Sequence, residues 1–391
     1  MPDDSLEIAA LCADWDIPEF VQSFRHIPGG KVVFGAGKLS TIGEEAHNLG
    51  ATRVLIVTDP GIAQTGAVDR ASEYLAERSI AVSTFDDVHE NPTTEDVARC
   101  VEAAREAEVD LIIGLGGGSS MDTAKGCNFI LTNGGRIHDY WGVDKAEKPM
   151  LPLIAVPTTS GTGSECQSFA LIADAETHAK MACGDKKAAA RVSILDPELT
   201  LTMPPAVTAH TGIDAIAHAL ETAVCRKRSE VSFAYSKAAW QLLDRGLEKV
   251  MADPGDIHAR SLMQLGAAFA GTAIENSMLG VAHSCANPLT AHFGIVHGQA
   301  VGTMLPHVID FNAQAPEAQE AYEQLHAAGG LSGRVRAHLL ASRMDLSLSQ
   351  LGVDQSLLGT LSEEAAKQWT AQFNPVEVDE DSLLRLYQDA W

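Results

Sequence analysis

An aspartate and a histidine, Asp214 and His218, stand four residues apart in a stretch with the apolar spacing of a helix. Four residues make about one helical turn, so both side chains should lie on the same helix face. The neighbouring residues Ile213, Ile216 and Leu220 indicate that this helix enters the protein interior. A carboxylate in the interior must be paired or bound to a metal ion. The spacing therefore predicts a polar site inside a helical region.

Two histidines further along the chain could complete this site. His283 and His297 each end a run of small or apolar residues. One aspartate and three histidines suit a divalent metal ion. The chain has 14 histidines, however, and most histidines bind no metal, so the Asp-x-x-x-His spacing alone also fits ordinary core residues.

A glycine-rich turn forms a second candidate site. The apolar strand predicted over 110–115 runs into Gly116, Gly117 and Gly118, and a predicted helix follows from Ser119. Glycines let the backbone approach a pyrophosphate closely, and a helix N-terminus directs free N–H groups at an anion. The spacing is not G-x-G-x-x-G, but the strand before the turn and the helix after it favour phosphate binding over a simple tight turn.

A hydroxyl-rich loop over 157–165 follows another predicted strand. Its Thr158, Thr159 and Thr162 offer hydroxyls that suit ribose and phosphate oxygens. The alternative is an ordinary turn rich in hydroxyls.

Two kinds of region must position these sites. Predicted strands alternate with helices up to about residue 200, which indicates a parallel sheet of the dinucleotide-binding kind, and the strand over 53–57 ends near Asp59. From Pro204 onward strand signals vanish and helical patterns dominate. We therefore predict an α/β N-terminal dinucleotide-binding domain over 1–203 and an all-α C-terminal metal-binding domain over 204–391.

The composition narrows the class of protein. The net charge of −24 argues against a nucleic-acid or anionic-membrane surface. Seven cysteines without a C-x-x-C pair, and an acidic N-terminus unlike a signal peptide, predict reduced thiols and a cytoplasmic location. The weakly polar run over 262–282 fits a buried bundle helix better than a membrane span.

The chain resembles the iron-containing, or type III, alcohol dehydrogenase family over nearly its whole length, from Phe34 to Trp391. The segment from Ser193 to Glu221 resembles the family's first signature at every position. The segment over 280–300 resembles the second signature at all but one.

This resemblance assigns roles to individual residues. It implies that the metal ligands are Asp214, His218, His283 and His297. The ion would be Fe(II), although nitrogen and oxygen ligands without thiolate also suit Zn(II). Asp59 would face the adenosine ribose, where a carboxylate accepts from a 2′-hydroxyl and repels a 2′-phosphate, which favours NAD over NADP. The other implied cofactor contacts are Asn91, Gly117, Gly118, Ser119, Thr158, Thr159, Thr162 and Lys180.

The resemblance also implies a dehydroquinate synthase-like architecture and an activity. The expected reaction is hydride transfer between NAD(H) and a small primary alcohol or aldehyde held at the metal in the cleft between the domains, in a homodimer or higher homo-oligomer. Three alternatives stay open: a dehydroquinate synthase-like lyase, a maleylacetate-reductase-like enzyme without metal, and a non-catalytic binding protein. The metal-free reductase is disfavoured because all four metal-ligand positions hold residues that can bind a metal.

Asn287 is the position at which the second signature fails. Family members that act on alcohols commonly have histidine there, where it is thought to help relay the alcohol's proton, and asparagine cannot titrate. His292 is near in sequence and could substitute, although a partly exposed structural histidine fits its position better. No catalytic side chain is assigned.

Overall fold

The computed structural model describes residues 4–177, 179–327 and 330–391. The chain forms two compact units. One contains Gln22–Thr159 and Gly163–Met203 together with the N-terminal helix, and the other contains Pro204–Trp391 together with residues 14–21 and 160–162. That the ranges 1–203 and 204–391 are domains able to fold on their own stays a prediction.

The first unit is built on a six-stranded sheet whose strand order is β1-β9-β6-β4-β2-β3. Every pair of neighbouring strands is parallel, which confirms the predicted parallel sheet. The strands are β1 (Lys31–Phe34), β2 (Arg53–Val57), β3 (Ala81–Phe85), β4 (Leu111–Gly116), β6 (Leu153–Pro157) and β9 (Val192–Leu195).

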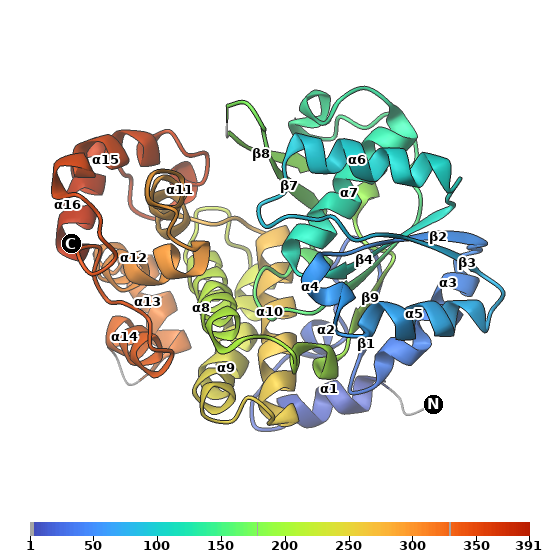
Figure 1. Ribbon diagram of the computed structural model, residues 1–391. Helices are drawn as coiled ribbons and strands as arrows, with labels where there is room; N and C mark the ends of the chain where they lie inside the picture. The colour runs from blue at the N-terminus through green and yellow to red at the C-terminus, as the bar shows by residue number, and fades with distance from the viewer. Residues whose placement is uncertain (1–3, 178, 328–329) are drawn as a thin grey trace. The chain divides into compact units, whose positions relative to one another are not determined.

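Helices cover both faces of this sheet (Figure 1). Successive strand residues point to opposite faces, so Leu55 packs toward one layer of helices and Ile56 toward the other. The first layer is α6 (Thr94–Glu106) and α7 (Gly118–Asn133), and the second is α3 (Ile42–Asn48) and α5 (Ala67–Ala76). Burial on both faces explains the apolar runs of the inner strands β2, β4 and β6.

A small second sheet was not predicted from the sequence. It has the order β5-β8-β7, with β5 (Gly142–Val143), β7 (Phe169–Ala173) and β8 (Lys180–Gly184). The pairing of β7 with β8 is antiparallel, and a bridge from Thr93 to Ala173 connects β7 to the start of α6.

The second unit is helical, and from Pro204 onward the described residues contain no strand. In Figure 1, α8, α9 and α10 lie side by side, and α11 packs against both α12 and α15. The helices are α8 (Pro205–Thr222), α9 (Glu230–Ala252), α10 (Ile257–Glu275), α11 (Val281–Phe293), α12 (His297–Asn312), α13 (Pro316–Leu325), α14 (Leu331–Ala341), α15 (Leu358–Ala366) and α16 (Glu380–Ala390).

The weakly polar run over 262–282 does not form one helix. It contains the buried second half of α10 and the first turn of α11, separated by a turn that begins at Asn276. Among the described residues, no helix is both long enough and apolar enough to cross a membrane.

Candidate metal centre and dinucleotide site

Three helices bring the predicted metal ligands together. Asp214 and His218 lie one turn apart on the buried face of α8, His283 lies in the first turn of α11, and His297 is the first residue of α12. Gly298 allows α12 to approach α8 closely, because a Cβ at this position would lie 2.1 Å from the backbone oxygen of His210.

The three imidazoles converge on a single carboxylate oxygen. Oδ1 of Asp214 lies 3.5 Å from Nε2 of His218, 3.4 Å from Nε2 of His283 and 3.7 Å from Nε2 of His297. The rings of His218 and His283 are stacked, with centroids 4.9 Å apart. Ligand atoms of Asp214, His283 and His297 all lie within 4.8 Å of one another.

The donor set of this cluster fits a divalent cation. Asp214 Oδ1 and His283 Nε2 are buried, and among the described residues neither atom has a hydrogen-bond partner. Leaving such atoms unpaired in the interior is costly, whereas an ion between them would coordinate both. Burial alone would raise the pKa of Asp214, but the charges of the three histidines lower that pKa well below its usual range. The carboxyl is therefore kept ionised, as a metal ligand must be.

Glu221 orients one of these histidines, a role that its place in the sequence did not predict. Its carboxylate accepts hydrogen bonds of 2.6 Å from Nδ1 of His283 and from the backbone N–H of Ala282. With the proton fixed on Nδ1, Nε2 is left for the metal, which is the usual arrangement around protein-bound metal ions. Burial acts against protonation, yet Glu221 and Asp214 together raise the pKa of His283 to about 9. A metal ion would thus replace a proton at this site.

Several predicted cofactor contacts lie together at the carboxyl edge of the large sheet. The helix α7 begins after Gly117, whose added Cβ would lie 3.4 Å from Thr159, and the N–H of Thr158 donates to the carbonyl of Gly116 over 2.9 Å. The glycine turn after β4 and the threonine loop after β6 therefore touch. Thr162 belongs to the second unit.

Asp59 also reaches the glycine turn. A Cβ on Gly116 would lie 3.3 Å from Oδ2 of Asp59, and Gly116 has a φ of 157°. The other oxygen, Oδ1, accepts from the N–H of Ile62 over 3.0 Å and caps the short helix α4 (Pro60–Ala63). One oxygen of Asp59 thus holds the local backbone, while the other faces the turn.

Asn91 and Lys180 both lie near Ala173, the last residue of β7. Ala173 is the register partner of Lys180, and its N–H donates to the carbonyl of Pro92 over 2.8 Å. Asn91 has a φ of 54°, a left-handed conformation that asparagine tolerates better than most residues.

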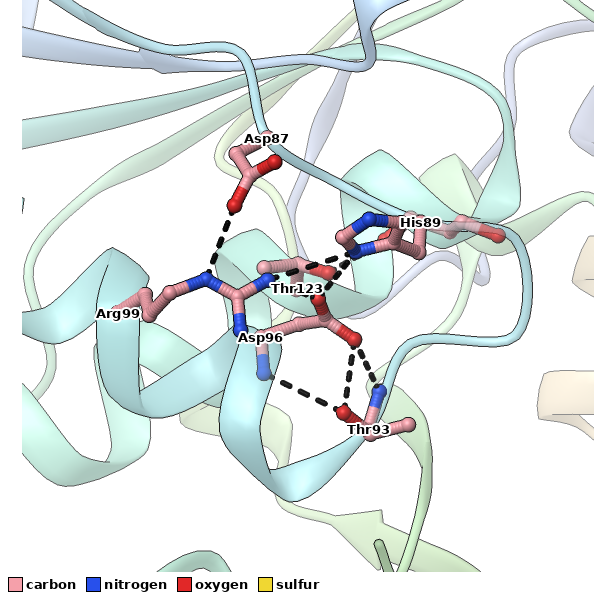
Figure 2. A network of polar contacts seen from close by, with 7 residues as sticks. Asp87, His89, Thr93, Asp96, Arg99 and Thr123 are labelled. Carbon is pink, nitrogen blue, oxygen red and sulfur yellow. Dashed lines mark hydrogen bonds and ion pairs between the residues drawn. The ribbon is translucent and has the colours of Figure 1, made fainter.

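A polar network next to the Asn-Pro turn was not predicted (Figure 2). Asp96 forms a capping box with Thr93 at the start of α6, and its carboxylate lies 2.7 Å from Nδ1 of His89 and 2.5 Å from Arg99. Arg99 also donates to Asp87 over 2.9 Å. Burial would raise the pKa of Asp96, but these hydrogen bonds and the charge of Arg99 lower it. The network ties residues on both sides of the turn to α6.

Asn287 and His292 are bound to different partners. Nδ2 of Asn287 donates to Oε1 of Gln368 over 3.0 Å. The partly exposed ring of His292 instead pairs with Glu364, with its Nε2 2.9 Å from the carboxylate.

Comparisons with known proteins agree with this architecture. Residues 29–197 match the family of iron-containing alcohol dehydrogenases, and residues 208–391 match the C-terminal region of the same family. The chain is 34% identical over 366 residues to alcohol dehydrogenase 4 of Schizosaccharomyces pombe. The aligned region covers 92% of this chain and 87% of that protein.

Comparison with solved structures points to the same family. A structure of 1,3-propanediol oxidoreductase superposes with a TM-score of 0.88 at 31% identity, covering 92% of this chain and 98% of that one. Sulfoacetaldehyde reductase from Bifidobacterium kashiwanohense in complex with NAD+ superposes with a TM-score of 0.85 at 27% identity, covering 96% and 98%. These relatives favour neither the lyase nor the metal-free reductase. The chain belongs to the iron-containing alcohol dehydrogenase family and is a metal-dependent, NAD-linked alcohol oxidoreductase.

Proposed function

We propose that Asp214, His218, His283 and His297 bind one divalent metal ion, at which a small primary alcohol or aldehyde reacts. The observation that carries this proposal is the convergence of three imidazole nitrogens within 3.7 Å of one aspartate oxygen. A metal ion bound there would act as a Lewis acid that acidifies an alcohol or polarises a carbonyl. The family favours Fe(II), and Zn(II) suits the same ligands.

The residues of the chain have separate tasks in this proposal. Glu221 fixes the proton of His283 on Nδ1 and keeps Nε2 directed at the ion. The N-terminus of α7, with Gly117, Gly118 and Ser119, would hold the pyrophosphate of NAD, and the remaining contacts would be Asp59, Asn91, Thr158, Thr159, Thr162 and Lys180. A nicotinamide bound there would supply the acceptor or donor of the hydride exchanged with the alcohol carbon.

We also propose that solvent takes the proton released by the alcohol. Asn287 cannot titrate, and His292 is held by Glu364, so neither is placed to act as a relay. Replacing His292 by Ala should then leave the pH profile of alcohol oxidation unchanged. Loss of a step from that profile in His292→Ala would assign the relay to this histidine.

The central test loads metal-free protein with Fe(II) or Zn(II) and assays a panel of alcohols and aldehydes with NAD and with NADP. Metal-dependent formation of NADH is expected. Equal turnover without metal, or a preference for NADP in the wild type, would contradict the assignments of the metal site and of Asp59.

The proposal extends to the location and the assembly of the protein. All seven cysteines are free and buried, which supports a reducing compartment such as the cytoplasm. A homodimer or higher homo-oligomer is proposed from the family resemblance. Light scattering coupled to size-exclusion chromatography would measure the molar mass, and a mass of one chain would contradict it.

A further inference from the structure

The start of α11, the helix that carries His283, is capped by a side chain from another helix. Its own N-cap residue, Gly280, has no side chain that could do so. Glu221 of α8 instead accepts from the N–H of Ala282 through Oε1 and from Nδ1 of His283 through Oε2, over 2.6 Å in each case. One carboxylate thus holds both the end of the helix and a proposed metal ligand.

The position of this carboxylate depends on the missing side chain of Gly280. A Cβ on Gly280 would lie 3.1 Å from Oε1 of Glu221 and 3.0 Å from Oδ1 of Asn374. Both distances are tighter than an ordinary van der Waals contact. Any larger residue at this position would therefore force one of the two neighbours to move.

Asn374 is the neighbour that is held in place. It is buried and forms a reciprocal amide pair with the buried Asn312, with hydrogen bonds of 3.1 and 2.6 Å. Its Nδ2 also donates to the carbonyl of Val376 over 2.9 Å. Moving Asn374 would break buried hydrogen bonds, which is costly, so a side chain at position 280 should displace Glu221 instead.

We infer that Gly280 is a positioning residue of the metal centre, because the space that it leaves keeps Glu221 against His283 and so keeps Nε2 of His283 directed at the ion. The inference rests on the proposed function of the metal site. Gly280 would act only through Glu221, since it has no side chain to reach the ion. Changes around the ligands of a metal ion weaken its binding about 10- to 100-fold, which sets the expected effect.

The test measures Zn(II) affinity by chelator competition on metal-free protein, and Gly280→Ala should weaken it at least about 10-fold. Glu221→Gln should do the same, because it replaces one accepting oxygen by an NH₂ donor. The double variant should bind Zn(II) about as weakly as Glu221→Gln alone, since a residue that acts through another adds nothing once that one is lost. The matched control is Gly333→Ala in α14, where a Cβ would enter open space, and its affinity should be unchanged.

Unchanged Zn(II) affinity in Gly280→Ala, an equal loss in Gly333→Ala, or losses that multiply in the double variant would overturn the inference. Failure of Gly280→Ala to fold, measured by circular dichroism, would overturn it too, because Gly280 would then serve the fold instead of the metal centre.

If the wild type bound neither Zn(II) nor Fe(II), the proposed metal site would fail, and NMR of the histidine ring protons would decide the inference. The signal of the proton on Nδ1 of His283 should move upfield in Gly280→Ala, because its hydrogen bond to Glu221 lengthens, and should stay in place in Gly333→Ala. A signal that does not move in Gly280→Ala would overturn the inference.

Discussion

At the scale of single residues, the metal site depends on four side chains that lie close together, with three imidazoles around one carboxylate oxygen of Asp214. Their distances to Asp214 Oδ1, from 3.4 to 3.7 Å, are too long for strong hydrogen bonds and leave room for an ion. Each ligand should therefore matter for metal retention more than for folding.

Replacing His218 by Ala should remove one ligand and abolish both metal binding and turnover. Changes outside the ligand shell alone weaken metal binding about 10- to 100-fold, so the loss of a ligand should exceed that range. Metal content by mass spectrometry and NADH binding by fluorescence measure the two effects, and NADH binding should persist. His292→Ala is the control because His292 pairs with Glu364. A normal metal content in His218→Ala would refute the ligand assignment.

Asp59→Ser should shift cofactor preference from NAD toward NADP. Serine can still cap α4 as Asp59 does, so the variant removes the negative charge with little damage to the local backbone. Relief of a like-charge contact should raise the ratio of kcat/KM for NADP to that for NAD by at least about tenfold. A ratio that does not move would show that Oδ2 of Asp59 does not face the ribose.

The sequence could predict the pair Asp214 and His218, because their contact is set by one helical turn. The pairing of His283 with Glu221 joins residues 62 positions apart, and it depends on how α11 packs against α8, which local spacing does not encode. One signal was available, since Glu221 follows Asp214 by seven residues, or two turns, on the same face of α8. The partner of Asn287 had no comparable local signal.

At the scale of elements, apolar runs and turn residues in the sequence predicted the strands and the glycine turn. They did not predict the side-chain contacts that support the Asn-Pro turn. The network around Asp96 combines a capping box, which has a local sequence pattern, with contacts to His89 and Arg99 that depend on the path of the preceding loop. The small sheet was missed for a similar reason, because β5 has only two residues and pairs with a strand far along the chain.

Asp96→Asn should destabilise the first unit and make its stability less dependent on acid. The folded state lowers the pKa of Asp96, so its ionised form contributes stability above the unfolded pKa near 4, and this contribution is lost as the pH falls through the lower folded pKa. At pH 7 the variant should lose about 1–3 kcal/mol of unfolding free energy. Below about pH 4 the difference in unfolding free energy between the two proteins should shrink as the pH falls, and it should vanish below the folded pKa of Asp96.

Denaturant unfolding between pH 3 and 7 measures this difference. Asp87→Asn is the matched control, since Asp87 also pairs with Arg99 but is exposed, and exposed pairs contribute little. A constant difference between wild type and Asp96→Asn over the whole pH range would show that the carboxylate charge of Asp96 is not what stabilises the turn.

At the scale of the whole molecule, the net charge of −24 opposes the compact state. Raising the ionic strength from about 10 to 150 mM shortens the screening length from about 30 to 8 Å and should raise the melting temperature by a few degrees. Differential scanning calorimetry measures the shift, with glucose at equal osmolarity as the uncharged control. A melting temperature that falls with salt would mean that favourable ion pairs outweigh the repulsion.

The ligands of the proposed centre come from three helices, α8, α11 and α12. An ion held by all three would act as a removable cross-link, since anything that binds only the folded chain stabilises it by mass action, by about 2.7 kcal/mol at a free concentration 100 times its dissociation constant. Removal of the ion by a chelator would then lower the stability of the folded protein as well as abolish its activity. The melting temperature of a preparation would therefore depend on how much metal it has bound. Two samples of identical sequence could differ in shelf life for that reason alone.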